Sequence, residues 1–304
     1  MSLPNAYMAL AGAIDGEVLR DERMSRHTTY RIGGPADLFV TCDSLPALTR
    51  CLEVLAEQRV PWVVLGRGSN VLVADEGYRG CVVCLRGSFC DVSVAGGLAC
   101  AGAGMMLSRL VSTSISCELG GLEPFAGIPG SVGGAIAMNA GTRREWIGSL
   151  VRDLVVLRPG EGLRRVSGSE VAWGYRSTSL AVDDVVLEAT LSLEPRPKDD
   201  IVRDMERRLV RRRASQPLGE PSCGSVFRNP GGGMAVGSMI EGCGLKGLSV
   251  GGARVSPRHA NFIVNEGGAT AADVLELIRR VRDAVGEAYG VELETEVRFL
   301  GFSS

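Results

Sequence analysis

The stretch Pro61-Trp62-Val63-Val64-Leu65-Gly66-Arg67-Gly68-Ser69-Asn70 decides the fold class of this 304-residue chain. Its apolar half, residues 61–65, predicts a buried strand, and its second half predicts a loop where that strand ends abruptly in glycine. Ahead of it we expect a strand over 37–41 and a helix that begins at Asp43 or Ser44. This strand–helix–strand opening predicts an α/β module.

The rest of the chain shows short apolar runs that alternate with glycine-rich turns. We expect a helical lead-in over 1–26, strands over 71–74, 81–85, 98–102, 153–158, 184–193 and 291–300, helices over 104–117 and 199–213, and strand and turn over 221–265. A capping box formed by Thr270 and Asp273 predicts the last helix. The polar, proline-rich residues 194–198 are typical of a domain boundary.

Composition excludes several classes of protein. Hydrophobic residues make up 45% of the chain, charged residues 22%, and the net charge is −2, which argues against a disordered tail or a basic nucleic-acid-binding protein. The apolar stretch 7–14 has no basic flank and is not typical of a signal peptide, and no run is long enough for a membrane span. We therefore expect a cytoplasmic protein that binds neither membranes nor nucleic acid.

The nine cysteines do not indicate a metal site. Cys81 and Cys84 have C-x-x-C spacing, but they lie within an apolar run, and no second pair follows at zinc spacing. We expect no metal, and buried thiols in a reducing cytosol.

Two glycine-rich stretches are candidate phosphate-binding loops. In residues 66–70 consecutive backbone N–H groups can form a nest for phosphate oxygens, although an ordinary tight turn explains that stretch about as well. Residues 127–134, followed by 138–141, hold four glycines in eight positions, a density that lets a pyrophosphate approach the backbone. Neither stretch has Rossmann spacing. Two such loops favour a large dinucleotide such as FAD, bound by another architecture.

Polar side chains elsewhere suggest a reactive site. Arg176 follows Trp173-Gly174-Tyr175, and Ser225 lies in a segment of hydroxyls and glycines over 221–230. A hydrolase triad is poorly supported because the chain has only two histidines, but such a serine can donate a proton to a carbanion. In the expected strand 291–300, one face is predicted to lie against the core and holds Val291, Leu293, Thr295, Val297 and Phe299, whereas the other face holds Glu292, Glu294, Glu296 and Arg298. The pattern alone favours a solvated acidic edge over a site.

The arginine run over 207–213 is interleaved with acidic residues, which is typical of a solvated helical face. One or two of these arginines could still reach a ligand diphosphate. No aromatic platform accompanies them, which argues further against binding of single-stranded nucleic acid.

Taken in this order, these stretches resemble the UDP-N-acetylenolpyruvoylglucosamine reductase family of peptidoglycan synthesis. The matching blocks are 27–34, 66–70, 121–141, 174–176, 222–230, 244–247, 259–265 and 296–299. The resemblance implies an α+β fold with an FAD-binding domain of the vanillyl-alcohol-oxidase (PCMH) type over 1–196, built from α/β subdomains of about 1–72 and 73–196. A C-terminal α+β substrate-binding domain follows over 197–304. The chain is similar to the shorter of the family's two types, because too few residues follow Arg176 for the extra loop of the longer type.

The same resemblance implies the reaction. NADPH reduces non-covalently bound FAD, and the hydride then passes to the enolpyruvyl group of UDP-N-acetylglucosamine enolpyruvate, which yields UDP-N-acetylmuramate. Arg176 and Glu296 match the positions that stabilise an enolate-like intermediate, and Ser225 matches the proton donor. The implied cofactor-binding residues are Arg31, Gly66, Arg67, Gly68, Ser69, Asn70, Val71, Gly127, Ile128, Pro129, Gly130, Ser131, Gly133, Gly134, Asn139 and Gly141. The implied substrate-binding residues are Tyr175, Arg213, Asn229, Lys246, Asn261 and Arg298.

We expect the protein to be a monomer. Two other functions remain open at this point. One is an FAD-dependent oxidase or dehydrogenase of the same fold that acts on a sugar or alcohol. Such enzymes often attach FAD through His or Cys, and no histidine lies near either glycine-rich loop. The other is a non-catalytic UDP-sugar-binding module, which would not need Ser225 and Glu296 as well as both loops.

Overall fold

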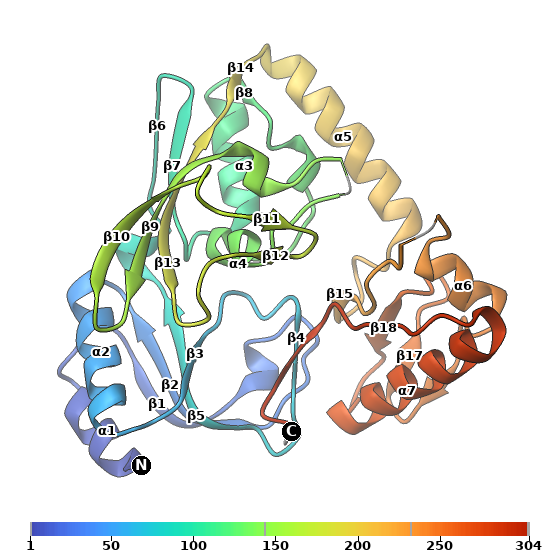
Figure 1. Cartoon of the computed structure of the whole chain (residues 1–304), viewed down its shortest axis with the longest axis horizontal. Coiled ribbons are helices and arrows are strands. Elements are labelled where there is room, and N and C mark those ends of the chain that lie inside the picture. The colour runs from blue at the N-terminus through green and yellow to red at the C-terminus, as the bar shows by residue number, and fades with distance from the viewer. Residues whose placement is uncertain (1, 143, 232, 303–304) are drawn as a thin grey trace. The chain divides into compact units, whose positions relative to one another are not determined.

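The computed structural model describes residues 2–142, 144–231 and 233–302 (Figure 1). Packing divides the described residues into two compact units. The first comprises Met1–Arg20, Leu38–Arg67 and Gly80–Arg211, and the second Asp21–Asp37, Gly68–Arg79 and Arg212–Ser304. The expected domain boundary at residues 196 and 197 remains a prediction, because compact packing does not by itself say which part binds the cofactor and which the substrate.

The described chain is α+β, as expected. Its α-helices are α1 (Leu3–Leu10), α2 (Leu45–Glu57), α3 (Leu107–Ser116), α4 (Val132–Ala137), α5 (Lys198–Ser215), α6 (Val236–Gly242) and α7 (Ala271–Tyr289). Its 3-10 helices are η1 (Met24–Arg26), η2 (Gly87–Cys90), η3 (Glu123–Phe125) and η4 (Ile147–Leu150).

The strands form several sheets, most of them antiparallel. They are β1 (Val18–Arg23), β2 (Pro35–Cys42), β3 (Trp62–Val64), β4 (Val71–Val73), β5 (Tyr78–Leu85), β6 (Val92–Ala95), β7 (Leu98–Gly102), β8 (Leu119–Gly120), β9 (Val151–Arg158), β10 (Gly162–Ser167), β11 (Trp173–Gly174), β12 (Ser177–Thr178), β13 (Val185–Ser192), β14 (Glu194–Pro195), β15 (Ser222–Ser225), β16 (Ser249–Val250), β17 (Ala253–Val255), β18 (Phe262–Asn265) and β19 (Arg298–Leu300).

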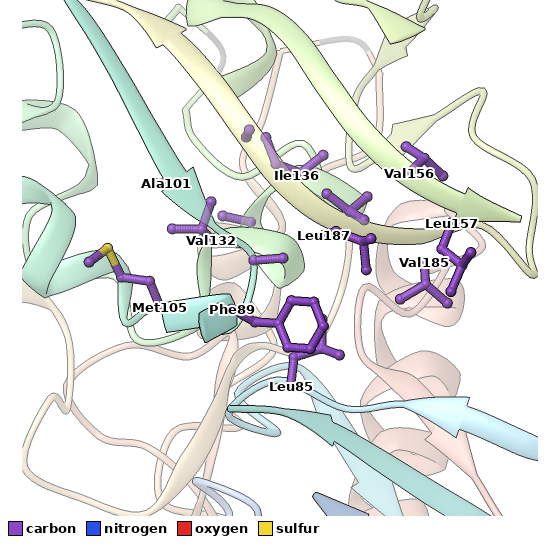
Figure 2. Close-up of a cluster of buried hydrophobic side chains, with 14 of the residues drawn as sticks. Leu85, Phe89, Ala101, Met105, Val132, Ile136, Val156, Leu157, Val185 and Leu187 are labelled. Atoms are coloured by element: carbon purple, nitrogen blue, oxygen red, sulfur yellow. The ribbon is translucent and has the colours of Figure 1, made fainter. Parts of the chain in front are cut away.

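The first unit contains a five-stranded antiparallel sheet with the order β10-β9-β13-β7-β6. Val156, Leu157 and Leu187 from its strands pack with Val132 and Ile136 of α4 in one buried cluster (Figure 2). A second sheet has the order β1-β2-β5-β3, with β3 and β5 parallel. The apolar stripe of α2 joins the same core. The core therefore supports α4 and the glycine-rich loop that leads into it.

The second unit has its own four-stranded sheet and core. The order is β15-β18-β17-β16, and neighbouring strands in it pair antiparallel. Val274, Ile278, Val281 and Val285 of α7, at helical spacing, are buried in this core. The short strands β4 and β19 pair in parallel, with Arg298 opposite Val71. This pairing joins the end of the glycine-rich loop 66–70 to the end of the chain.

Several local predictions are confirmed. Ser44 is the N-cap of α2, and its hydroxyl accepts a hydrogen bond from the Ala47 N–H at 3.4 Å. Thr270 and Asp273 form both bonds of the expected capping box at the start of α7. The expected strand over 98–102 matches β7 residue for residue.

Three expectations need correction. The lead-in 1–26 is helical over α1 and the short η1 but not between them, because 18–23 forms β1, whose charged side chains are tolerated at the edge of its sheet. The expected strand 291–300 pairs regularly only over β19, and Phe299 is exposed rather than facing a core. The region 221–265 contains α6, which its glycine content concealed.

None of the helices in the described ranges is both long and apolar enough to span a membrane.

Candidate active site

The two glycine-rich loops meet within the first unit. A Cβ on Gly66 would lie 2.3 Å from the Ser131 Oγ, so the backbone of one loop contacts a side chain of the other. Gly66, Arg67, Gly127 and Pro129 are exposed around this contact. The arrangement presents accessible backbone from both loops, with the exposed Arg67 next to Gly66.

These residues fit the anionic pyrophosphate of a dinucleotide. Gly130 has a φ of 146°, which other residues rarely adopt, and it immediately precedes Ser131, the N-cap of the helix α4. The Ser131 hydroxyl accepts a hydrogen bond from the Gly134 N–H at 3.2 Å and caps this helix. Packing also requires one of these glycines. A Cβ on Gly133 would lie 2.9 Å from the Ala103 Cβ, so Gly133 is needed for packing.

Arg176 lies in the tight turn between β11 and β12. Its φ is 58°, a left-handed conformation that is costly for a residue with a side chain. The Nη1 of Arg176 donates a hydrogen bond to the Gly141 carbonyl at 2.8 Å. The guanidinium carbon lies 5.4 Å from the centre of the Tyr175 ring. The turn therefore holds the guanidinium against the segment that follows α4.

Asn139 ties that segment to the same turn. Its side-chain amide donates to the Gly174 carbonyl at 2.8 Å and accepts from the Gly148 N–H at 3.1 Å. The side chain is buried. These contacts give Asn139 a positioning role toward the Arg176 turn, and its expected contact with the cofactor stays a prediction.

In the second unit, the backbone brings the segments of Ser225 and Glu296 together. Ser225 ends β15, and the next carbonyl, that of Val226, accepts a hydrogen bond from the Glu296 N–H at 2.7 Å. The Arg228 N–H bonds the Glu294 carbonyl at 2.9 Å farther along the same pair of segments. The Glu294 carboxylate is 75% exposed, whereas Glu296 is partly buried. The pattern favoured a fully solvated row of acidic side chains, but Glu296 is less exposed than Glu294.

The distal half of the first glycine-rich loop also packs in the second unit. The Asn70 side-chain amide donates to the Glu296 carbonyl at 3.1 Å, and the Asn70 carbonyl accepts from the Arg298 N–H at 3.0 Å. A Cβ on Gly68 would lie 2.4 Å from the His27 carbonyl oxygen. Asn70 therefore fixes the backbone on both sides of Val297, next to the candidate catalytic carboxylate.

Arg31 lies in the same unit, within the block 27–34. It is exposed and has a φ of 57°, between the buried residues Tyr30 and Ile32. The block is held to β15 by the Thr29 hydroxyl, which donates to the Ser222 carbonyl at 2.7 Å.

Three of the expected substrate-binding residues surround α6. Asn229 accepts a hydrogen bond from the Val236 N–H at 3.0 Å, at the start of this helix. The Lys246 ammonium pairs with Glu241 of the helix at 2.7 Å. Asn261 is buried and bridges the backbone of Phe227, accepting from its N–H and donating to its carbonyl, both at 2.9 Å. The side-chain hydrogen bonds of Asn261 therefore position the backbone, as those of Asn139 do.

His259 is a residue that the sequence did not single out for the site. Its Nδ1 accepts a hydrogen bond from the Asn261 N–H at 3.3 Å. Burial, with the nearby Lys246 charge as a second cause, lowers the pKa of His259 below its usual value. The neutral imidazole is therefore part of the surroundings of Lys246. The sequence signal that could have identified His259 was its position within the matching block 259–265.

The Tyr30 phenol and the Cys223 thiol are both buried, and Cys223 lies two residues before Ser225. Burial raises the pKa of Cys223 to about 12, and the charge of Glu296 acts in the same direction. Burial also raises the pKa of Tyr30 well above its usual value. Both groups are thus neutral at pH 7, and Cys223 is a packing residue rather than a reactive thiol.

The remaining candidates are less enclosed. Arg213 is exposed near the end of α5, where its carbonyl accepts a hydrogen bond from the Arg258 guanidinium at 3.2 Å. Arg298 is exposed in β19. The candidates divide between the units, with Gly66, Arg67, the 127–141 loop, Tyr175 and Arg176 in the first and the others in the second.

Comparison with known proteins assigns the family. The model "FAD binding domain" matches residues 36–159, and "UDP-N-acetylenolpyruvoylglucosamine reductase, C-terminal domain" matches 216–300. UDP-N-acetylenolpyruvoylglucosamine reductase of Heliobacterium modesticaldum is 45% identical over 95% of this chain and 92% of its own length. That of Moorella thermoacetica is 45% identical over 96% and 98%.

A solved structure agrees along nearly the whole chain. The crystal structure of UDP-N-acetylenolpyruvylglucosamine reductase from Thermus caldophilus superposes with a TM-score of 0.82 at 37% identity, over 94% of this chain and 99% of that one. The FAD-binding domain is of the expected PCMH type. On this similarity of sequence and structure, the chain belongs to the UDP-N-acetylenolpyruvoylglucosamine reductase family.

Proposed function

We propose that Arg176, Ser225 and Glu296 carry out the reaction of this family in the present chain. The reaction is the NADPH-dependent, FAD-mediated reduction of UDP-N-acetylglucosamine enolpyruvate to UDP-N-acetylmuramate in peptidoglycan synthesis. Similarity to reductases of this name over about 95% of the chain is the observation that carries the proposal. The protein is accordingly an oxidoreductase with FAD as cofactor and NADPH as co-substrate.

The two glycine-rich loops hold the cofactor. Bound FAD would supply the hydride chemistry that links NADPH to the enolpyruvyl group. The loop 127–134 and residues Gly66 and Arg67 bind the pyrophosphate through backbone N–H groups and the guanidinium, which the contact between Gly66 and Ser131 supports. Gly68, Ser69, Asn70, Val71 and Arg31 complete the set, together with Asn139 and Gly141.

Arg176 and Glu296 stabilise the charge that follows hydride addition. Adding hydride to one carbon of the double bond leaves negative charge on the neighbouring carbon and its attached carboxylate. The Arg176 guanidinium, held by the Gly141 carbonyl, offers this charge a fixed positive group. Glu296 acts in its protonated form or through a hydrogen bond, because a bare carboxylate would repel the enolate.

Ser225 donates the proton that completes the reduction. Its hydroxyl ends β15 beside the Glu296 segment, where the backbone bond between Val226 and Glu296 keeps the two residues in register. A carbanion is basic enough to take a proton from an alcohol, so no histidine is required.

Polar and charged side chains hold the sugar nucleotide. Asn229, Lys246 and Arg213 contact the UDP moiety, while Tyr175, Asn261 and Arg298 line the reacting end. Lys246 is half-buried and carries a positive charge that suits a diphosphate. In domain terms, residues 1–196 bind FAD and 197–304 bind substrate. The protein acts as a cytoplasmic monomer and engages neither membranes nor nucleic acid.

The test is the visible spectrum of the purified protein at about 450 nm, where oxidised flavin absorbs. Anaerobic NADPH should bleach the absorbance, and only UDP-N-acetylglucosamine enolpyruvate should restore it. Recovery with oxygen alone, without any effect of the sugar nucleotide, would identify an oxidase of the same fold. A colourless protein that binds the sugar nucleotide would identify a non-catalytic module.

A further inference from the structure

The segment that carries the second glycine-rich loop has a buried carboxylate at its start. Glu123, in η3, has a side chain only 3% exposed. One of its oxygens accepts a hydrogen bond from the Gly121 N–H at 2.6 Å, and the other accepts one from an Arg196 Nη1 at 2.7 Å. Arg196 follows β14, directly ahead of the long helix α5. The start of the loop segment is therefore bonded to the chain that leads into α5.

A second carboxylate closes the same segment at its other end. Glu145 lies four residues after Gly141. Its two carboxylate oxygens accept hydrogen bonds from the two Nη atoms of Arg208, both at 2.8 Å. This bidentate geometry is the strongest form of an arginine–carboxylate pair. The hydrogen bond from Arg208 to Glu145 raises the pKa of the guanidinium further above its usual value. Arg208 lies on α5, so both ends of the segment bond to one continuous stretch of chain.

Asp204 connects the two ends. Its carboxylate lies 3.9 Å from Arg196 Nη1 and 3.3 Å from Arg208 Nε, and it also bonds Arg207. Desolvation opposes ionisation of Asp204, but the hydrogen bond from Arg207 and the charge of Arg208 outweigh it and hold the pKa of this carboxyl below its usual value. Charges of alternating sign thus run without a break from Glu123 to Glu145.

The same residues line a cavity of about 300 Å³ in the first unit. Glu123, Glu145, Arg196, Asp204 and Arg208 surround it, together with apolar groups that include Phe125 and Trp146. Side chains around a cavity have fewer packing partners than those of a filled core. Hydrogen bonds and charge, rather than close packing, therefore hold the ends of the loop segment here.

We propose that Arg196 and Arg208 are positioning residues for FAD, clamping residues 123–145 at both ends so that the glycine-rich loop keeps the shape that binds the pyrophosphate. Glycine loses more backbone freedom on ordering than other residues, so a loop rich in glycine binds tightly only if its ends are already fixed. The clamp acts through Glu123 and Glu145 and does not touch the cofactor. It rests on the proposal that this loop binds FAD.

The test compares the FAD dissociation constant of apoprotein variants, measured by flavin fluorescence, with the melting temperature of each apoprotein. Arg196→Met and Arg208→Met should each raise the dissociation constant about ten-fold, the equivalent of one lost charge-assisted hydrogen bond. Glu145→Gln, at a half-exposed position, gives a milder change that spares folding. The double variant Glu123→Gln/Arg196→Met leaves no buried charge unpaired and should show the same loss of affinity as Arg196→Met.

Arg158→Met is the matched control. The Arg158–Asp184 pair is bidentate, with N–O distances of 2.7 and 2.9 Å, and its carboxylate is also only 3% exposed. It lies in the same unit but joins β9 to the turn before β13, away from the loop segment. Arg158→Met should lower the melting temperature and leave the FAD dissociation constant within about two-fold.

Two results would overturn the clamp. Equal loss of FAD affinity in Arg158→Met would show that any broken ion pair in this unit has the same effect. Unchanged affinity in Arg208→Met and Glu145→Gln, while Gly66→Ala weakens FAD binding, would refute the clamp and leave the loop proposal intact. If Gly66→Ala also left affinity unchanged, both proposals would fall.

Discussion

Backbone conformation at single residues marks the candidate site more sharply than composition does. Six non-glycine residues in the described ranges have a positive φ, and three of them, Arg31, Asn139 and Arg176, are among the predicted site residues. A left-handed conformation costs a residue with a side chain about 1 kcal/mol or more. It persists only where surrounding bonds enforce it, as Asn139 and Gly141 do for the Arg176 turn.

The role of Ser225 is testable at this scale. Ser225→Ala should leave NADPH-driven bleaching of FAD intact and slow reoxidation by the enolpyruvyl substrate by about 10²- to 10⁴-fold, the usual contribution of a general acid. Stopped-flow absorbance measures the two half-reactions separately. Ser222→Ala, in the same strand, should affect neither, because Ser222 bonds Thr29 through its backbone carbonyl, which the substitution leaves in place. Equal slowing of both half-reactions in Ser225→Ala would rule out a proton-donor role.

His259 gives a prediction about pH. Burial lowers its folded-state pKa, so between that value and the ordinary value of 6.5 the unfolded chain binds more protons than the folded one. The neutral His259 therefore contributes stability above pH 6.5 that is lost as the pH falls below it. Because the chain has only two histidines, NMR titration of their ring protons can assign both. A His259 pKa at or above 6.5 would contradict the buried position.

At the scale of elements, local signals predicted what local interactions determine. The capping box of α7 and the N-cap of α2 involve residues three positions apart, so they could be read from the sequence. The short helices α4 and α6 were missed because they are rich in glycine, and the packing of α4 in the core supplies what propensity does not. The edge strand β1 was missed because its charged residues show no strand periodicity.

The start of α7 also depends on a residue far away in the sequence. Asp75 accepts hydrogen bonds from the Ala271 and Ala272 N–H groups at 2.8 and 3.0 Å, which places a negative charge at the positive end of the helix. Asp75→Ala should lower the free energy of unfolding by about 1 kcal/mol, as measured by urea denaturation. Glu76→Ala removes an adjacent exposed acid that makes no such contact and should have no effect. Equal effects of the two substitutions would refute the capping role.

At the scale of the whole molecule, the sequence predicted the fold class and the family, but not the way the chain is shared between the units. Residues 21–37 and 68–79 pack with the C-terminal part of the chain, although they lie far from it in sequence. The bonds responsible, such as Asn70 to Glu296 and Asn265 to Tyr30, join residues 226 and 235 positions apart. No local pattern encodes such pairs, and only the resemblance to a family had linked these stretches to one site.

The parallel pairing of β4 with β19 has a consequence for synthesis of the chain on the ribosome. Residues 71–73 find their strand partner only when 298–300 have been made, which at 5–20 residues per second is roughly 10 to 45 seconds later. Until then β4 lacks its partner in this two-stranded sheet, and the second unit cannot close. The nascent chain therefore exposes the apolar segment Val71-Leu72-Val73 for most of its translation. The loop 66–70, which precedes this segment, is made early, but its Asn70 can form its bonds to Glu296 and Arg298 only when the last residues have been added.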